Sequence, residues 1–232
     1  MSCMDLLLCA VFIIAGLFLF IIVIGKKYNG ADWDHYFINV LDGWIRIYCQ
    51  KFHRQENQRF QLPENKKLII ASNHESSIDP FLLITATNKP IRFMIAEEEY
   101  HRPILHWMFK AAGCIPVNRS GRVDVAFKET LRVINTGELV GIFPQGGIHS
   151  ADTPKPRIKP GIIKLSELSG CDIFPVRIKG ISAPGTMFKC IIKRGHIQFD
   201  VNQPITSEQA QNKTFKQGIA DWFIGKTDTI II

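Results

Sequence analysis

The stretch from Leu6 to Ile24 constrains the fold of this chain most strongly, because its 19 residues include no charged side chain. As a helix it would span roughly 28 Å, close to the thickness of a bilayer core. A signal peptide would have a positive segment before a shorter apolar run, whereas only Asp5 precedes this run and Lys26 and Lys27 follow it. We therefore predict an uncleaved transmembrane helix within a membrane anchor of residues 1–27; a signal peptide and a buried core helix are the alternatives.

The distribution of basic residues predicts the orientation of this single-pass anchor. No lysine or arginine precedes the apolar run, and five follow it closely: Lys26, Lys27, Arg46, Lys51 and Arg54. By the positive-inside rule the body of the protein then lies on the cytoplasmic side of the membrane. The six cysteines include no C-x-x-C pair and fit reduced thiols in that compartment, rather than disulfides or zinc ligands.

The net charge of +7 and pI of about 9.1 favour anionic partners. The basic residues are scattered along the chain, and neither zinc-finger spacing nor an aromatic RNA-binding motif is present. We therefore expect a membrane lipid surface as partner and no nucleic acid; the oligomeric state stays open.

Residues 28–66 are expected to connect the anchor to the body. Apolar residues recur at helical spacing from Asp32 to Arg54, which predicts a helix that lies in the membrane interface or packs on the body, or does both. Gln55 to Lys66 is polar and contains a proline, which is typical of a linker.

From residue 67 to residue 232, apolar strand-like runs alternate with helix-like runs, which predicts one α/β domain with a mainly parallel sheet flanked by helices. The expected strands are Leu68–Ser72, Ile91–Ala96, Cys114–Val117, Leu139–Phe143, Ile173–Ile178, and Lys189–Ile192 with His196–Val201. The expected helices are Pro80–Thr87, Ile104–Ala112, Val123–Asn135, Pro160–Ser169 and Ser207–Phe223.

The turn after the first expected strand carries His74 and, five residues later, Asp79. Residues five apart do not share a helix face, so a strand end followed by a tight turn is needed to pair them. Asp79 is expected as the helix N-cap with Pro80 first in the helix, which lets the carboxylate orient the imidazole as a general base. The alternatives are that Asp79 only caps the helix while His74 is an ordinary loop residue, and that Ser76 or Ser77 is a nucleophile, although no G-x-S-x-G motif surrounds them.

Four blocks of the sequence resemble the glycerolipid acyltransferase family, whose type member is 1-acylglycerol-3-phosphate acyltransferase. They occur in the family's order, over about residues 68–180. The blocks are Asn73-His74-Glu75-Ser76-Ser77-Ile78-Asp79, Gly113-Cys114-Ile115-Pro116-Val117-Asn118-Arg119, Gly141-Ile142-Phe143-Pro144-Gln145-Gly146-Gly147 and Phe174-Pro175-Val176-Arg177. They look like the family's N-H-x-S-x-x-D, G-x-I-P-V-x-R, F-P-E-G and apolar-Pro-Val motifs.

The resemblance implies direct transfer of a fatty acyl group from acyl-CoA or acyl carrier protein, as co-substrate, to the free hydroxyl of a lysophospholipid. The favoured acceptor is 1-acylglycerol-3-phosphate, which would give phosphatidate for phospholipid biosynthesis. His74 would be the general base, Asp79 would orient it, and Arg119 would bind the acceptor's phosphate through its planar guanidinium. Without the resemblance, Arg119 reads as a surface ion-pair residue. No cofactor and no metal are expected.

The chain departs from the family pattern around the acceptor. The family's third block carries a glutamate, thought to contact the acceptor, where this chain has Gln145. Gly146 and Gly147 allow positive φ or close backbone approach, so we expect them to bind substrate as well; an ordinary turn is the alternative. Basic residues common after this block and before the second block are missing, with Glu97-Glu98-Glu99 in the latter region. These changes leave open a different lyso-lipid acceptor and a catalytically weak lipid-binding relative.

Overall fold

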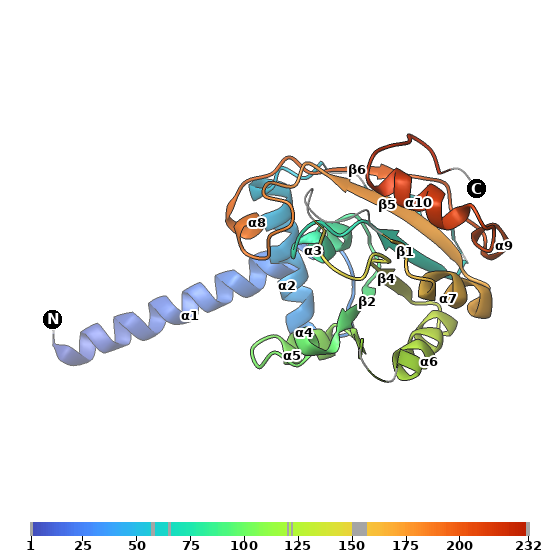
Figure 1. The fold of residues 1–232 in the computed structure, drawn as a ribbon. Coiled ribbons are helices and arrows are strands. Elements are labelled where there is room, and N and C mark those ends of the chain that lie inside the picture. The colour runs from blue at the N-terminus through green and yellow to red at the C-terminus, as the bar shows by residue number, and fades with distance from the viewer. Residues whose placement is uncertain are drawn as a thin grey trace.

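The computed structural model describes residues 2–56, 59–64, 66–119, 121, 123–149 and 157–230. One six-stranded sheet organises the body, with helices on both faces and one long helix, α1 (Cys3–Tyr28), extending away from it (Figure 1). The strands are β1 (Leu68–Ser72), β2 (Ile91–Ala96), β3 (Ile115–Val117), β4 (Leu139–Ile142), β5 (Asp172–Lys179) and β6 (Gln198–Val201). Their spatial order is β3-β2-β4-β1-β5-β6.

The first five strands run parallel and β6 pairs antiparallel with β5 at one edge, which confirms the predicted mainly parallel sheet. β1 lies between β4 and β5, and every residue of β1 is buried. Parallel strands buried on both faces are continuously apolar, as Leu68-Ile69-Ile70-Ala71 is. Because parallel strands end at the same edge, the turns that follow β1, β2, β3 and β4 lie along one edge of the sheet.

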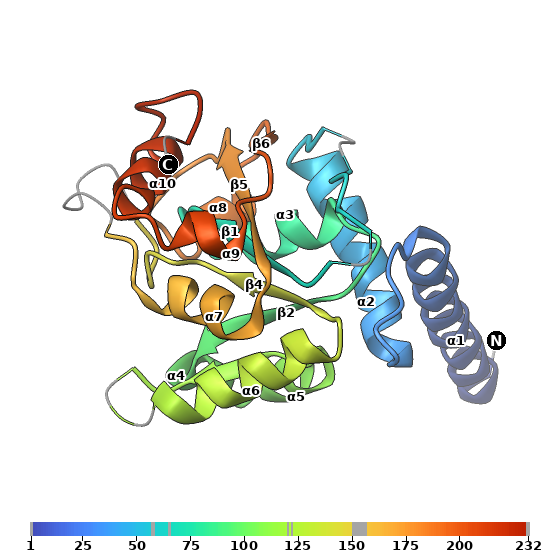
Figure 2. The same ribbon diagram turned by 90° about the vertical axis from the view of Figure 1, so that its right-hand side faces the viewer.

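Two hydrophobic clusters cover the two faces of the sheet. One contains Leu68 and Ile70 with residues of α2 (Tyr36–Ile47) and α3 (Asp79–Thr85). The other contains Ile69 and Ala71 with residues of α6 (Val123–Asn135), α7 (Gly161–Ser169), α9 (Ser207–Ala210) and α10 (Phe215–Phe223). Figure 2 shows α2 and α3 on one side of the sheet and α6, α7, α9 and α10 on the other. The remaining helical segments are short: the π-helical turn Tyr48–Phe52, α4 (Glu97–Tyr100), α5 (His106–Ala111) and α8 (Lys189–Ile192).

Helix α1 has the length and composition of a membrane span, and its apolar window is not buried inside the protein. Its N-terminus is closed by a capping box in which Ser2 and Asp5 exchange side-chain and backbone hydrogen bonds. These features are compatible with the anchor expected from the sequence.

Helices α1 and α2 cross at Gly25 and Gly43, so that neither backbone carries a side chain at the contact. A Cβ atom added to Gly43 would lie 1.7 Å from the carbonyl oxygen of Gly25, so only glycine fits at this position. The indole nitrogen of Trp44 donates a hydrogen bond to the carbonyl of Ile21, at 3.0 Å. The expected helix within Asp32–Arg54 therefore packs against α1 and against the body, and it leaves Tyr36 and Phe37 exposed at its start.

A buried ion pair fixes α2 to the end of α3. Arg46 Nε donates to Asp42 at 2.6 Å, and its terminal nitrogens donate to the carbonyls of Ile84, Thr85 and Thr87, each at 3.0 Å. Ile84 and Thr85 end α3 and Thr87 follows it, and the last carbonyls of a helix have no partner within the helix. A planar guanidinium with several fixed donors suits this role.

Some expected elements were wrong. Lys189–Ile192, predicted as a strand together with His196–Val201, is the one-turn helix α8, because the edge of β5 is already paired with β6. Ser207–Phe223 is divided into α9 and α10 by a turn, and α4 was not predicted. In the expected linker, Phe60 is buried and its N–H donates to the carbonyl of Ala86, while residues 57, 58 and 65 lie outside the described part.

Replacing Gly43 by alanine should destabilise the protein by about 1–3 kcal/mol, the usual cost of forcing atoms into a packed interior. Gly16→Ala is the matched control, because Gly16 is also helical and has nothing within 4 Å of the added methyl. Both changes gain helix propensity, so only crowding separates them. Chemical denaturation of the purified full-length variants measures the difference, and equal stabilities would contradict the close helix crossing.

Candidate active site

The candidate site lies at the carboxyl edge of the sheet, where the turns after β1 and β4 meet. Asn73, directly after β1, is buried and pairs with both backbone groups of Ile178 in β5, accepting at 2.7 Å and donating at 2.9 Å. This amide therefore extends the β1–β5 ladder beyond the end of β1 and fixes the position from which His74 projects.

The structure places His74 and Asp79 in contact. The distance from His74 Nδ1 to Asp79 Oδ2 is 2.8 Å. Because a carboxylate accepts and does not donate, Nδ1 carries the hydrogen, and Nε2 is the ring nitrogen with a lone pair. Asp79 is fully buried, whereas His74 retains partial exposure. The pair therefore has a fixed tautomer, and the side chain that carries the basic nitrogen is partly exposed.

The turn between β1 and α3 is organised around the Asp79 carboxylate. Its Oδ2 also accepts the backbone N–H groups of Glu75, at 2.7 Å, and Ser76, at 2.9 Å. Its Oδ1 accepts the hydroxyl of Ser76. The expectation that Asp79 caps the helix was one residue off, because the helix begins at Asp79 after Ile78 and the carboxylate points back to the turn.

The serines of this turn are used in structural contacts. Ser76 is fully buried, and its hydroxyl is committed to Asp79. The Ser77 hydroxyl donates to the carbonyl of Met187. A fully buried hydroxyl cannot reach a substrate, and a hydroxyl bonded to a backbone carbonyl has no base to activate it, which argues against the serine-nucleophile alternative.

Three groups from the β4 side complete the surroundings of His74. The ring of Phe143 stacks on the imidazole, with centroids 4.1 Å apart and planes 17° apart. Gln145 accepts the backbone N–H of His74 at 2.9 Å through its side-chain oxygen, and the N–H of His149 donates to the carbonyl of His74 at 2.7 Å. Gln145 thus joins the two turns, a contact that an acidic or amide side chain at this position can make equally well.

The glycines of the second turn differ from each other. Gly146 has φ +80°, a left-handed conformation that strains any residue with a Cβ atom, so glycine is favoured there; the side chain of Lys159 lies against its Cα. Gly147 has open space around its Cα. Lys159, two residues before α7, is a neighbour of this turn that the sequence motifs do not include.

Arg119 lies apart from the His74–Asp79 pair. It follows β3, which is separated from β1 by β2 and β4, so it stands roughly 14 Å along the same edge. It is exposed and lines a pocket of about 230 Å³ with Glu97, Glu98, His101 and Asn118. The carboxylates, which come from α4 at the end of β2, make this pocket mixed in charge.

Two titratable groups in the turns beside His74, Glu75 and His149, have shifted pKa values. Burial raises the pKa of Glu75, with a smaller contribution from the Asp79 charge, and its hydrogen bond from Asn73 acts in the opposite direction. Burial, followed by the nearby His74, lowers the pKa of His149. The lowered pKa favours the neutral form of His149, so this side chain does not place a positive charge beside His74 at neutral pH.

The arrangement can remove a proton from a hydroxyl group that reaches Nε2 of His74, with Asp79 stabilising the imidazolium that forms. Among the described residues no group of three His, Cys, Asp or Glu side chains could hold a metal ion.

The chain was compared with known protein families and with curated proteins. Residues 51–179 match the model of the Acyltransferase family. The 1-acyl-sn-glycerol-3-phosphate acyltransferase of Bacillus subtilis is 23% identical over 78% of this chain and 83% of its own length. N-acylphosphatidylethanolamine synthase of Arabidopsis thaliana is 29% identical over 44% of this chain and 40% of its own length.

A solved structure shares the fold. The 1-acyl-sn-glycerophosphate acyltransferase PlsC of Thermotoga maritima superposes with a TM-score of 0.62 at 16% identity, over 85% of this chain and 80% of that one. Because the family model covers more than half of the chain, the protein belongs to the glycerolipid acyltransferase family and is an O-acyltransferase.

Replacing His74 by glutamine should lower kcat for acyl transfer by about 10²–10⁴, the usual contribution of a positioned general base. The thermal midpoint should change little, because the backbone contacts of His74 to Gln145 and His149 remain. Thiol release from the acyl donor measures activity, and His196→Gln, at an exposed position, is the control. Full activity in the His74 variant would remove the proposed base.

Replacing Glu75 by glutamine should stabilise the protein at neutral pH. The folded state raises the Glu75 pKa above its value of 4.5, so ionisation costs stability as pH rises past 4.5 and through the folded pKa. The glutamine cannot ionise and can still accept from Asn73. The thermal midpoint of the variant should exceed that of wild type only above a pH of about 4.5. The control Glu64→Gln, at an exposed position, should have the wild-type midpoint at every pH. A constant difference between the Glu75 variant and wild type at every pH would contradict this explanation.

Proposed function

We propose that the protein transfers a fatty acyl group from acyl-CoA or acyl carrier protein to the free hydroxyl of a lysophospholipid, with 1-acylglycerol-3-phosphate as the first candidate acceptor. The observation that carries this proposal is the 2.8 Å contact of His74 Nδ1 with the buried Asp79 carboxylate, which leaves Nε2 as the base. The names of the relatives from Bacillus subtilis and Borreliella burgdorferi, both 1-acyl-sn-glycerol-3-phosphate acyltransferases, support the choice of acceptor.

The reaction needs no acyl-enzyme. Nε2 of His74 takes the proton of the acceptor's hydroxyl while the oxygen attacks the thioester carbonyl. The carbon–oxygen bond forms, the carbon–sulfur bond breaks, and the leaving thiolate receives the proton from the imidazolium. Asp79 fixes the tautomer and stabilises the charge on the ring, and Gln145, Gly146 and Gly147, on the adjoining turn, would contact the substrate.

The lipid substrates explain why such an enzyme would be attached to a membrane. We propose that α1 spans the bilayer as a single-pass anchor and that the body lies on the cytoplasmic side, following the positive residues after the span. The domain limits follow from this scheme: an anchor over residues 1–27, a connecting region over 28–66 and the acyltransferase domain over 67–232. The basic surface would favour anionic lipids and the phosphates of the acyl donor.

A second candidate acceptor is a lyso-lipid whose headgroup carries an amine. One observation favours it: the pocket that contains Arg119 also contains Glu97 and Glu98, which would pair with an ammonium beside a phosphate. The similarity to an N-acylphosphatidylethanolamine synthase points in the same direction. The catalytically weak lipid-binding alternative is excluded if any acceptor supports turnover.

A donor-by-acceptor matrix on the purified full-length protein tests these proposals. Acyl-CoA and acyl carrier protein donors are combined with lysophosphatidate, lysophosphatidylethanolamine and lysophosphatidylcholine, and thiol release and product mass are measured. Turnover with lysophosphatidate alone supports the first candidate, and preference for the amine-bearing acceptor supports the second. No thiol release with any pair would overturn the enzymatic proposal.

Replacing Arg119 by alanine should raise the apparent KM for a phosphate-bearing acceptor by roughly 10–100-fold, the equivalent of one charged hydrogen-bond pair. Lysine at this position should recover part of the loss, because it keeps the charge without the fork. Arg132→Ala, on the exposed face of α6, is the control. An unchanged KM in Arg119→Ala would make it an ordinary surface residue.

A further inference from the structure

The segment around α8 carries apolar side chains that the body does not cover. Phe188 is 71% exposed and Ile192 is 76% exposed, and Met187 and Ile191 are also exposed. Four exposed apolar residues within six positions form a contiguous patch, unlike the single exposed apolar side chains that are normal on soluble proteins. Such a patch marks a surface with a partner.

The position of this patch identifies the partner. In Figure 1, α8 lies on the side of the body from which α1 extends, and α5 lies on that same side. Ile104, before α5, is 82% exposed, and Trp107 within α5 is exposed as well. Two separate segments with exposed apolar side chains therefore lie on the side of the body from which the membrane-span helix extends.

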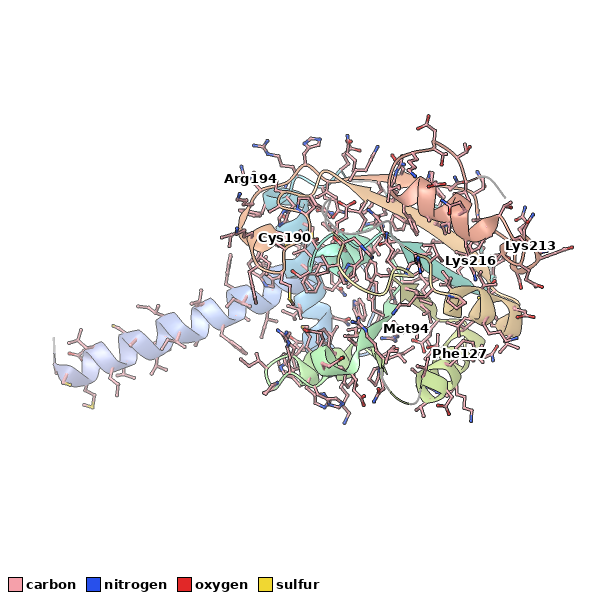
Figure 3. All side chains as sticks on the ribbon, viewed as in Figure 1. Met94, Phe127, Cys190, Arg194, Lys213 and Lys216 are labelled. Carbon is pink, nitrogen blue, oxygen red and sulfur yellow. The ribbon has the colours of Figure 1, made fainter. Side chains whose placement is uncertain are left out.

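The charges around the patch fit an anionic lipid surface. Lys189, Lys193 and Arg194 alternate with the apolar residues and are exposed. Figure 3 shows Cys190 and Arg194 on this segment, above the base of α1. Apolar side chains with interspersed lysine and arginine are typical of elements that lie in the headgroup layer of a bilayer.

The same segment is fastened to the catalytic turn. The N–H of Gly185 donates to the carbonyl of Glu75 at 2.7 Å, and the Ser77 hydroxyl donates to the carbonyl of Met187. On its other side, the Tyr48 hydroxyl donates to the carbonyl of Ile191 at 2.6 Å. These hydrogen bonds connect the α8 segment directly to the residues between His74 and Asp79.

We propose that residues 187–194 are a second membrane contact, whose apolar side chains enter the interfacial layer while its basic residues pair with lipid phosphates. This contact holds the turn between β1 and α3, which carries His74, at a fixed distance from the bilayer, so that an acceptor reaches His74 without leaving the membrane surface. The inference rests on the proposed membrane anchor and lipid acceptor. It adds a site that the anchor does not require.

Photo-crosslinking in the full-length protein tests the contact. A benzophenone amino acid replaces Phe188 or Ile192, and the protein is reconstituted into vesicles of phosphatidylcholine with one-fifth phosphatidylglycerol. Leu168 is the matched control, since it is apolar and 55% exposed but belongs to α7, on the opposite side of the body in Figure 1. Phe12, in the middle of α1, is the control for the anchor.

Lipid adducts, identified by mass, are expected at positions 188, 192 and 12 and not at position 168. Adducts at position 12 without adducts at 188 and 192 would overturn the second contact and leave the anchor standing. Crosslinks from 188 and 192 to another protein chain would overturn it as well, in favour of a protein partner. Absence of adducts at position 12 would overturn the anchor together with the inference that rests on it.

A kinetic experiment tests the coupling. The double variant Phe188→Ser and Ile192→Ser should raise the apparent KM for an acceptor embedded in vesicles by roughly tenfold, because two apolar side chains no longer enter the membrane. Activity on a short-chain, monomeric acceptor should stay as in wild type, and Leu168→Ser should change neither. Equal losses on both acceptors would show a fold defect and contradict the proposal, whereas no turnover by wild type on either acceptor would overturn the proposed function itself.

Discussion

The buried carboxylate of Asp79 is the interaction on which the site depends. A charged group is taken out of water at this position, and such burial is tolerated only when hydrogen bonds replace the lost hydration. The donors come from the imidazole of His74, two successive backbone N–H groups and the Ser76 hydroxyl. The same contacts that satisfy the carboxylate therefore give the turn its shape and the imidazole its tautomer.

The neighbouring strands supply the rest of the support. Asn73 ties the turn to β5, and Gln145 and His149 tie it to the segment after β4. His74 is thus held from both sides of β1 by groups that belong to different parts of the chain. The stacked ring of Phe143 covers one face of the imidazole.

Local sequence carried enough information for the sheet and for the His74–Asp79 contact, because apolar periodicity and a five-residue turn are short-range properties. Local sequence was insufficient where contacts between segments far apart in the chain determine the structure. The residues 189–192 have strand-like composition but form a helical turn, since β6 occupies the edge of β5. The contact of Gln145 with the His74 backbone joins residues 71 positions apart, and no pattern in either segment predicts it. Arg46 entered the sequence analysis only as one of the basic residues after the apolar run, yet it is buried, pairs with Asp42 and donates to carbonyls at the end of α3.

The anchoring of α3 by Arg46 has a practical consequence for how the enzyme can be shortened. The helix that begins with Asp79 ends on carbonyls bound by Arg46, and the carboxylate of Asp42 that balances this guanidinium accepts the N–H of Gly30. Removing the apolar helix together with residues 29–46 would remove the hydrogen bonds of Arg46 to the C-terminal end of α3, the helix that bears Asp79. A water-soluble version has to be cut before Gly30, with the surface of α2 that α1 covers made polar.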